Sequence, residues 1–511
     1  MFEVKKEIPA SSYGRPASFL LFLGAIFRVA SFFLSKNSGG DAGARVSLTA
    51  HWLQHPTFKL IFEVYPPGHF WLIAALATVT PNVVVAGRLL SLVLGIASVF
   101  VVWRLARLLY GEAAGMLSLA VFAFYTMHIG YSTTSSSEVP FVFFMLVGLF
   151  FFFLYFHEGS QKLRYLAFSG IALSIAGAIR FEGWIVFGEL SLLLVLLWLW
   201  GPLKRGLGSI LPPLLVFGMT GGAWPAVMMT YCWRTFGDPL YLITSTHSRM
   251  ATALAVTGHS VGRELVVIPT ALVLSLSPLA FAAAIYGIVK SRHLPLAFGF
   301  AGIAVVFLGI QSYEILRGGF LAVARYSLAP GTMLAIISGY ALELLCIKLL
   351  PHRVKLAHAT VIVLLLLNLG GILVLSETPN RFADNFAAIS PRLRHVTRIT
   401  TVGAYLRAHM GPQDAIVIDN YNYESNIIAD AAGLPLLYGT RAYLVAAHNQ
   451  IEVQEYIRAE HPRFLVYSDL GALRSSFVLP RECGKGADMD GIHFQCEFAN
   501  QTYRVYELSY R

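Results

Sequence analysis

Residues 140–156 read PFVFFMLVGLFFFFLYF, a stretch without a charged side chain. A helix that crosses the hydrocarbon core of a bilayer needs about 20 mostly apolar residues, so this stretch predicts a membrane span. Working outward, we find similar stretches on both sides. About eleven spans are predicted, at residues 17–34, 87–103, 113–131, 140–156, 165–179, 184–200, 210–231, 265–289, 294–310, 328–347 and 356–375.

The composition agrees with a polytopic α-helical membrane protein. Of the 511 residues, 56% are hydrophobic and only 13% are charged, and the mean hydropathy is +0.64. Soluble globular proteins carry roughly 25% charged residues. Much of the surface of this chain therefore faces something other than water.

The distribution of Lys and Arg predicts the orientation, because these residues collect in short cytoplasmic loops. With the N-terminus inside, the predicted cytoplasmic segments hold Lys5, Lys6, Arg15, Arg104, Arg107, Lys162, Arg164, Lys204, Arg205, Lys290, Arg292, Lys348, Arg353 and Lys355. A further apolar stretch, residues 65–81, would invert every later loop if it crossed, so we predict an interfacial helix there. The C-terminus is then outside.

Two other interpretations, a cleaved signal peptide at the N-terminus and a nucleic-acid-binding role for the basic residues, are weaker. Residues 17–34 form a longer apolar stretch than the roughly 7–15 residues of a cleaved signal peptide, which favours an uncleaved first span. The net charge of +10 is a topology signal, and no nucleic-acid partner is expected, because no basic patch alternates with aromatic residues outside the predicted spans.

The chain divides into a transmembrane module, residues 1–375, and a soluble extracytoplasmic α/β domain, residues 376–511, where charged residues return. In this domain we predict helices at 398–409, 426–432 and 443–460, buried strands at 415–419 and 464–468, and a closing strand pair at 494–498 and 503–508. Cys483 and Cys496 lie in an oxidising compartment if the outside is periplasm, so a disulfide and two free thiols both stay open.

The acidic residues of the predicted outer loops are candidates for chemistry, because charges near a membrane carry a desolvation cost. Asp41 lies in the first outer loop within Gly39-Gly40-Asp41-Ala42-Gly43. It is either a general base or metal ligand at an outward-facing site, or an ordinary turn residue. Glu138 ends a hydroxyl-rich run, residues 131–137, which either binds a sugar or begins a helix.

Basic residues of the outer side have two interpretations as well. Arg180 and Glu182 lie two residues apart and either pair with each other or face a common polar cavity. Arg325, followed by Tyr326, either holds a phosphate or reaches to lipid headgroups. His69, in the interfacial segment, either donates to a phosphate or is incidental.

Two further features complete the candidates. Arg28, inside the first predicted span, is expected to face the bundle interior and to pair there. Residues 232–263 are predicted as a long outer loop that covers a substrate or is merely irregular.

Together these motifs resemble the type C glycosyltransferases, the GT-C membrane superfamily, and the nearest branch looks like the protein O-mannosyltransferase and aminoarabinose-transferase group. The resemblance covers about the first 350 residues. It rests on the order of motifs: Asp41, Tyr65-Pro66-Pro67, Glu138-Val139-Pro140, Arg180-Phe181-Glu182-Gly183-Trp184 and Arg325-Tyr326.

The resemblance implies transfer of a sugar from a polyprenyl-phosphate donor to a lipid, protein or glycan acceptor outside the cytoplasm, usually with inversion. It implies an enzyme of the plasma (inner) membrane. Asp41 would act as the base and Glu138 as a helper in acceptor or metal binding. Arg325 is the first choice for the donor phosphate, with Arg180 or His69 second.

Tyr326 and Glu182 would complete the implied donor site. Many members of the family carry a pair of acids in the first loop, but Ala42 follows Asp41 here. One carboxylate is a poor site for a hard cation, so a divalent metal stays open, with Asp41 its ligand if there is one. No other cofactor is expected.

Two other function classes stay in view. A flippase or transporter of lipid-linked sugars would place polar groups along a path at mid-depth, often with internal repeats. A non-catalytic scaffold with an outer binding domain would not need Asp41, Glu138, Arg180 and Arg325 to converge on one cavity.

Overall fold

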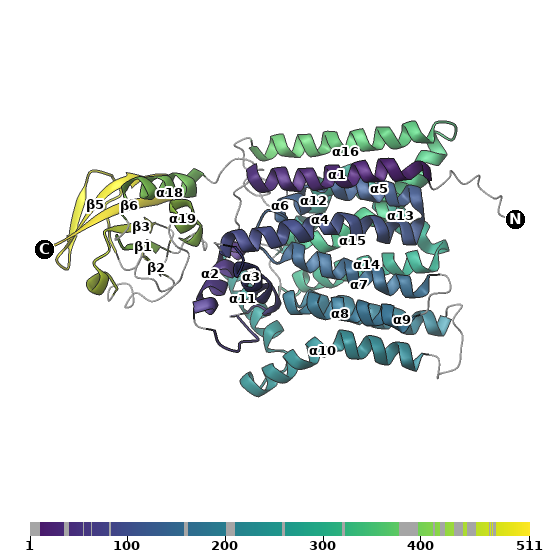
Figure 1. Ribbon diagram of the computed structural model, residues 1–511, viewed down its shortest axis with the longest axis horizontal. Helices are drawn as coiled ribbons and strands as arrows, with labels where there is room; N and C mark the ends of the chain where they lie inside the picture. Colours follow the sequence, from purple (N-terminus) through teal and green to yellow (C-terminus); the bar gives the residue numbers. More distant parts are fainter. Residues whose placement is uncertain are drawn as a thin grey trace.

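A computed structural model describes most of the chain. The described residues are 11–34, 40–54, 56–62, 64–80, 83–157, 162–200, 210–257, 261–318, 322–377, 397–411, 414–419, 425–433, 443–446, 456–469, 471, 473 and 477–511. Within these ranges the chain forms a bundle of long helices with a smaller sheet domain beyond one end of it (Figure 1).

The helical part extends from α1 to α16. Its helices are α1 (Ser11–Leu34), α2 (Gly40–Gln54), α3 (Gly68–Ala77), α4 (Val83–Tyr110), α5 (Glu112–Ala123), α6 (Thr126–Tyr131), α7 (Glu138–Phe156), α8 (Leu163–Ile179), α9 (Glu182–Trp200), α10 (Leu211–Phe236), α11 (Tyr241–Thr257), α12 (Val261–Leu276), α13 (Pro278–Lys290), α14 (Pro295–Leu316), α15 (Leu328–Leu349) and α16 (Val354–Glu377), with short 3₁₀ turns η2 (Ser291–His293) and η3 (Ala324–Ser327). Large apolar side chains such as Phe22 and Leu367 are exposed on the outside of the bundle, where lipid replaces water.

The structure supports a multi-pass membrane protein but not the predicted count in full. In the described residues, eight helices are long and apolar enough to cross a bilayer: α1, α4, α7, α9, α10, α14, α15 together with η3, and α16. A ninth span results if α12 and α13, which meet at 109°, are counted as one. The remaining two predicted spans correspond to α5 and α8, which are shorter apolar helices.

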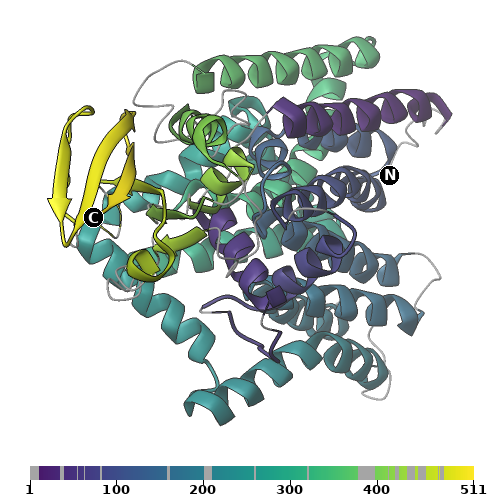
Figure 2. The ribbon, with the colours of Figure 1, turned by 60° about the vertical axis from the view of Figure 1, so that its left-hand side comes forward.

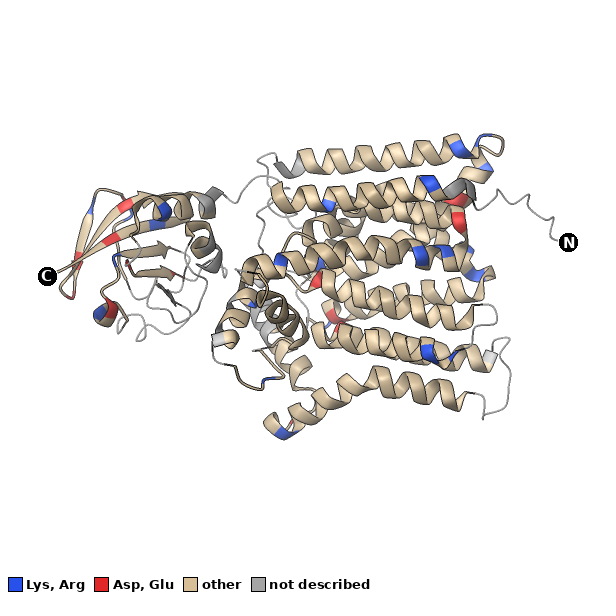
Figure 3. Ribbon diagram, viewed as in Figure 1, with Lys and Arg blue, Asp and Glu red and all other residues tan. Residues whose placement is uncertain are grey.

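The two ends of the bundle differ. Tyr110, at the end of α4, stacks on Tyr340 of α15 with ring centroids 4.6 Å apart and lies near η2. This is the end where α1 begins, and Lys and Arg gather toward it (Figure 3). The opposite end, which we call the domain face, lies next to the C-terminal domain (Figure 1). A basic end away from the domain fits the predicted orientation, which itself stays a prediction.

Short helices cover the domain face, where loops were expected. The apolar stretch 65–81 forms α3, which is too short to cross and packs tightly, since a Cβ atom on Gly68 would lie 2.7 Å from the backbone oxygen of Ala178. The glycine-rich first loop continues as α2 from Gly40 onward rather than as a turn. The predicted loop 232–263 is wrong as well, because α10, α11 and α12 occupy most of it.

Within the described residues, the C-terminal domain is a six-stranded mixed sheet with the helices α18 (Thr397–His409) and α19 (Ser425–Ala432) and a short helical segment at 456–460. The strand order is β2-β1-β3-β6-β5-β4, and the strands are β1 (Ile416–Asp419), β2 (Tyr443–Ala446), β3 (Phe464–Ser468), β4 (Gly486–Met489), β5 (Ile492–Ala499) and β6 (Tyr503–Tyr510). β1 pairs in parallel with β2 and β3, whereas β6, β5 and β4 continue the sheet antiparallel.

Most predicted elements of this domain are present, with two errors. The helix predicted at 443–460 is wrong at its start, because residues 443–446 form strand β2 at the edge of the sheet. Residues 447–455 lie outside the described part. Residues 456–460 are helical, as predicted. β4 was not predicted. The predicted domain boundary at 375/376 lies beside residues 378–396, also outside the described part, so it stays a prediction. Cys483 and Cys496 form a disulfide.

The domain rests on the short helices of the bundle. One apolar cluster joins α18, α19 and the sheet to α2 and to the start of α4, and it includes Val46 and Ala50 of α2 together with Ile399 and Ile428. All four side chains are nearly inaccessible to solvent. The green helices of the C-terminal domain lie beside the purple helix α2 in Figure 2. The first-loop helix is therefore part of the interface between membrane module and C-terminal domain.

Candidate functional site

Three helix ends that are far apart in sequence meet at the domain face. Glu138 is the first residue of α7, and Glu182 is the first residue of α9. Carboxylates are favoured there because the N-terminal end of a helix carries partial positive charge. Arg180 follows α8 in an extended conformation, and Arg325 and Tyr326 lie in η3, just before α15.

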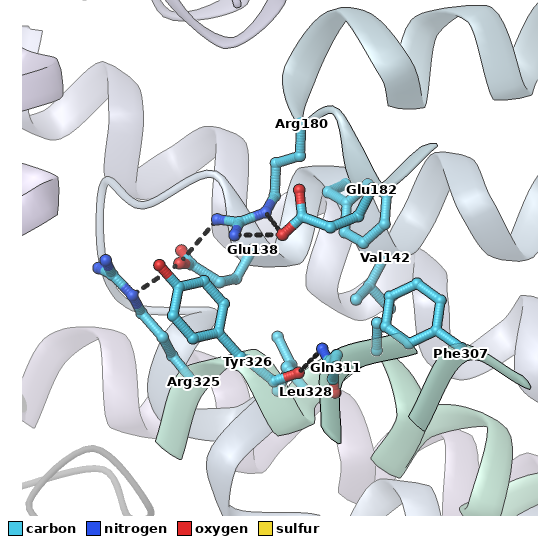
Figure 4. Close-up of a pocket in the computed structure, with 11 residues that line it drawn as sticks. Glu138, Val142, Arg180, Glu182, Phe307, Gln311, Arg325, Tyr326 and Leu328 are labelled. Atoms are coloured by element: carbon cyan, nitrogen blue, oxygen red, sulfur yellow. Dashed lines mark hydrogen bonds and ion pairs between the residues drawn. The ribbon is translucent and has the colours of Figure 1, made fainter. Parts of the chain in front are cut away.

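The charged groups form one network (Figure 4). Arg180 donates from Nη1 to Glu138 Oε1 at 3.0 Å, and from Nε and Nη2 to Glu182 Oε1 at 3.0 and 2.5 Å. Arg325 Nε lies 3.5 Å from the same Glu138 oxygen. Arg180 also donates to the hydroxyl of Ser137 at 3.2 Å. Glu138 thus lies between two guanidinium groups, and Arg180 lies between two carboxylates.

Burial makes these contacts strong. The side chain of Glu138 is 3% exposed, compared with 11% for Arg180, 12% for Glu182 and 21% for Arg325. Burial alone would lower the pKa of Arg180, but the carboxylates of Glu182 and Glu138 more than offset it, and the net pKa is raised. Arg180 is therefore a fixed cation, while Arg325 has the longer contact and the more accessible side chain.

A narrow cavity opens beside this network. Glu138, Arg180, Glu182, Gln311, Arg325 and Tyr326 line its polar side, and Phe141, Val142, Phe307, Leu328 and Ala329 line its apolar side. Gln311, on α14, donates from Nε2 to the backbone oxygen of Tyr326 at 3.0 Å. The cavity therefore offers charged groups next to an apolar wall, which suits a molecule with a polar head and a hydrocarbon tail.

Gln311 is the residue that sequence reasoning missed. It lies in the apolar helix α14, one residue beyond the predicted span 294–310, and a polar side chain within such a helix usually faces the protein interior. That signal was present in the sequence. An amide is uncharged, so it lacks the large desolvation cost that makes Asp, Glu, Lys and Arg conspicuous near apolar segments.

The hydroxyl-rich run before Glu138 does not line the cavity. Residues 132–137 are buried and pack against α4, where a Cβ atom on Gly95 would lie 2.3 Å from Ser132 Oγ. Arg88 of α4 donates to the backbone oxygen of Thr133 at 2.7 Å. Packing against α4 occupies hydroxyl groups such as those of Ser132 and Ser135, whereas Ser137 accepts a hydrogen bond from Arg180, so the structure favours the helix-start interpretation of this run.

Arg28 pairs inside the bundle, as its position predicts, but with backbone rather than with an acid. Its guanidinium donates to Gly24 at 2.8 Å and to Phe122 at 3.3 Å, and it lies 2.9 Å from His128 Nδ1. The carbonyl group of Phe122 lies at the end of α5, where the helix is interrupted before α6 begins. Arg28 thus stabilises a helix break within the membrane module.

The remaining candidates lie elsewhere or outside the described part. Asp41 is in the first turn of α2, but its side chain is not among the described ones. His69 is fully buried in α3 beside Phe70, and it does not line the cavity.

The cavity does not fit a divalent cation. Among the described residues, no group of three or more His, Cys, Asp or Glu side chains is close enough to hold a metal ion. The two carboxylates of the network are separated by the guanidinium of Arg180, which lies where a shared cation would have to bind. These residues are arranged as ion pairs and not as oxygen ligands of a metal.

Comparisons with known proteins concern both sequence and fold. Residues 64–219 match the sequence profile of the family described as dolichyl-phosphate-mannose-protein mannosyltransferase. This segment includes Glu138, Arg180 and Glu182 and ends before Gln311, Arg325 and Tyr326. No curated protein sequence matches the chain significantly.

The fold is similar to that of several solved structures. ArnT from Cupriavidus metallidurans in the apo state has a TM-score of 0.61 at 13% identity, with 96% of this chain and 97% of that chain covered. The same protein bound to undecaprenyl phosphate gives a TM-score of 0.59 at 12% identity. The archaeal oligosaccharyltransferase AglB from Archaeoglobus fulgidus, in complex with an inhibitory peptide and a dolichol-phosphate, gives 0.50 at 12% identity, over 88% of this chain and 69% of that chain.

Proposed function

We propose that this chain, a membrane glycosyltransferase of the GT-C type, transfers a sugar from a polyprenyl-phosphate donor to an acceptor on the extracytoplasmic face of the membrane. The acceptor is a lipid, a protein or a glycan. Transfer proceeds with inversion, by direct attack of the acceptor on the sugar carbon that bears the phosphate.

One observation carries the proposal: Glu138, Arg180 and Arg325 converge on one cavity with Glu182 and Tyr326. They come from three separate helix ends, and a scaffold has no need to bring them together. A transporter would need polar groups along a path through the membrane. Among described residues, this charged network is instead confined to the domain face, next to an apolar wall.

Each residue has a role in the proposed reaction. Asp41 accepts the proton of the acceptor hydroxyl as the bond to the sugar forms. Arg325, the more accessible cation, turns from Glu138 to the donor phosphate and stabilises the charge that develops as the polyprenyl phosphate leaves. Tyr326, which lines the cavity, is a further candidate for the donor side, whereas His69 lies away from the cavity in α3.

Arg180 keeps its two carboxylates and thereby orients them. Glu138, freed on one side when Arg325 turns, assists in holding sugar or acceptor, and Glu182 supports it. The apolar wall of Phe141, Val142 and Phe307 accommodates the first part of the lipid tail. This arrangement keeps the hydrocarbon in the membrane while the phosphate and the sugar remain at its surface.

We further propose that all eleven apolar segments cross, with the N-terminus in the cytoplasm and the C-terminal domain outside the plasma membrane. The helix α8, with 17 residues, is about 26 Å long, close to the roughly 30 Å of a hydrocarbon core. The pair α5 and α6 crosses as one interrupted helix, with Arg28 at the interruption.

The test compares wild-type protein with Asp41→Asn in detergent, with a panel of polyprenyl-phosphate sugars as donors and membrane extract as acceptor. Loss of the base should lower the transfer rate at least about a hundredfold, within the usual range for general base catalysis. The thermal unfolding midpoint should not change. Asp490→Asn, an exposed carboxylate in the turn between β4 and β5, is the matched control.

The outcomes separate the parts of the proposal. Equal transfer by wild type and Asp41→Asn would contradict the assigned base and leave the reaction standing. If folded wild-type protein transfers no sugar from any donor in the panel, the proposed reaction itself is contradicted.

A further inference from the structure

The short segment that carries Arg325 is held on both sides by side chains from other helices. Glu264, in the first turn of α12, accepts a hydrogen bond from the backbone N–H of Ala322 at 2.7 Å. On the far side of Arg325, the amide of Gln311 on α14 donates to the backbone oxygen of Tyr326 at 3.0 Å (Figure 4). The backbone around Arg325 is therefore fixed from two directions.

Glu264 holds its backbone partner with a buried carboxylate. The residue is 3% exposed, and a carboxylate loses more hydration free energy on burial than a neutral hydroxyl or amide does. The first turn of α12 offsets part of this cost, because the N-terminal end of a helix favours an anion. A charge-assisted hydrogen bond is roughly twice as strong as a neutral one, so Ala322 is held firmly.

We propose that Glu264 positions Arg325 for the phosphate of the donor. This inference rests on the function proposed above, in which Arg325 turns from Glu138 to that phosphate. Glu264 does not line the cavity, so it acts through Arg325 and not on the donor itself. It is a positioning residue, and its partner Ala322 lies three residues before Arg325.

The turn η3 needs such support from outside. It has four residues, and the hydrogen bonds of a 3₁₀ turn have poorer geometry than those of an α-helix. Arg325 Nε lies 3.5 Å from Glu138, and the Arg325 side chain is 21% exposed, so the guanidinium has room to turn. A fixed backbone limits this motion to the side chain. The guanidinium then meets a developing anion without rearrangement of the chain, which is what electrostatic stabilisation requires.

The experiment compares two probes that bind to purified full-length protein in detergent: undecaprenyl phosphate, and undecaprenol, which lacks the phosphate. Because the lipid tail is the same, the ratio of the two affinities reports the phosphate contact. Glu264→Met removes the acceptor and keeps a side chain of similar length. We expect the affinity ratio to fall at least about tenfold, the value of one hydrogen bond between Arg325 and a charged group, while undecaprenol binding changes little.

Two further variants separate the hydrogen bond from the charge. Glu264→Gln keeps an acceptor at the same length without the charge, so the affinity ratio should stay within about threefold of wild type. Glu264→Asp keeps the charge but is one methylene shorter and does not reach Ala322, so it should lower the ratio as Glu264→Met does. Glu264→Asp also carries the test if Glu264→Met does not fold.

A second background separates positioning from general stability. In Arg325→Met the phosphate contact is already lost, so adding Glu264→Met should not lower the affinity ratio further. Ser118→Ala is the matched control, because it removes a buried hydrogen bond of 2.8 Å from α5 to the backbone of Ile336 on α15, and neither residue lines the cavity. It should lower the thermal unfolding midpoint and leave the affinity ratio unchanged.

The results that would overturn the inference differ from those that would overturn the function. If Arg325→Met loses the affinity ratio but Glu264→Met and Glu264→Asp keep it, Glu264 does not position Arg325. The same holds if Glu264→Gln loses as much as Glu264→Met, or if Glu264→Met lowers the ratio further in the Arg325→Met background. If wild type binds undecaprenyl phosphate no more tightly than undecaprenol, or if Arg325→Met keeps the ratio, the proposed donor site fails and the inference fails with it.

Discussion

Replacing Arg180 tests whether the network at the domain face is a unit. Arg180→Met removes the guanidinium and keeps a side chain of moderate length. We expect both a loss of stability and a loss of transfer activity. The measurement is the free energy of unfolding in mixed detergent micelles, together with the rate of sugar transfer by the fraction that remains folded.

The magnitude follows from the contacts that are lost. Arg180 makes charge-assisted hydrogen bonds to Glu138 and Glu182, whose side chains are 3% and 12% exposed. Removing one partner of a buried ion pair costs about 3–5 kcal/mol, because the remaining charge stays buried. Glu138 keeps a second partner in Arg325, which limits its share. We therefore expect a loss of about 4 kcal/mol, roughly a thousandfold in the unfolding equilibrium.

The pairing itself is tested by a double substitution. Glu182→Gln added to Arg180→Met removes the carboxylate that has lost its partner Arg180, so part of the stability should return, with a coupling energy above about 0.5 kcal/mol. Arg104→Met, an exposed Arg on α4, is the control and should cost little. Strict additivity of the two substitutions, or unchanged stability of Arg180→Met, would refute the description of the network as one electrostatic unit.

Three further predictions concern the surroundings of the site. Arg28→Met should lower the thermal stability of the membrane module by about 1–3 kcal/mol, because carbonyl groups at the break after α5 lose their donor; unchanged unfolding followed by circular dichroism would contradict this role. Cys483→Ser should destabilise the C-terminal domain by about 2–3 kcal/mol, because the bond to Cys496 closes a loop of 13 residues; identical melting with and without reductant in wild type would speak against it. Ile428→Asp, in the apolar cluster that joins α19 to α2, should reduce transfer although it lies outside the cavity, and full activity in the purified variant would show that the domain does not support α2.

The membrane spans were predictable because burial in lipid leaves a strong local signal. Each apolar stretch must hydrogen-bond its own backbone, so a helix follows from composition alone. The number of spans was harder to predict, because α5 and α8 are short apolar helices that pack against longer neighbouring helices. Strands β1, β3, β5 and β6 were predictable in the same local way, as short apolar or alternating runs.

Elements whose conformation depends on distant partners were predicted poorly. The glycine-rich first loop forms α2, which packs against the C-terminal domain, and the long stretch 232–263 is mostly helical, with Cys232 and Leu242 packed against Leu60 and Ile61. Residues of β2 have a helical pattern, but the edge of β1 offers them a strand partner. Neighbours supplied from elsewhere in the chain override local preference in each of these cases.

The sequence by itself determined that this chain is a helical membrane protein, and it selected Glu138, Arg180, Glu182, Arg325 and Tyr326 as residues of one face. The charges of the first four are costly near apolar segments and therefore conspicuous, and Tyr326 directly follows Arg325. Only the tertiary structure decided that Arg180 lies between two carboxylates, that the hydroxyl-rich run is packed against α4, and that Gln311 faces the cavity. The physical reason is that desolvation is a property of a residue and its local sequence, whereas pairing and cavity shape depend on how helix ends from separate parts of the chain come together.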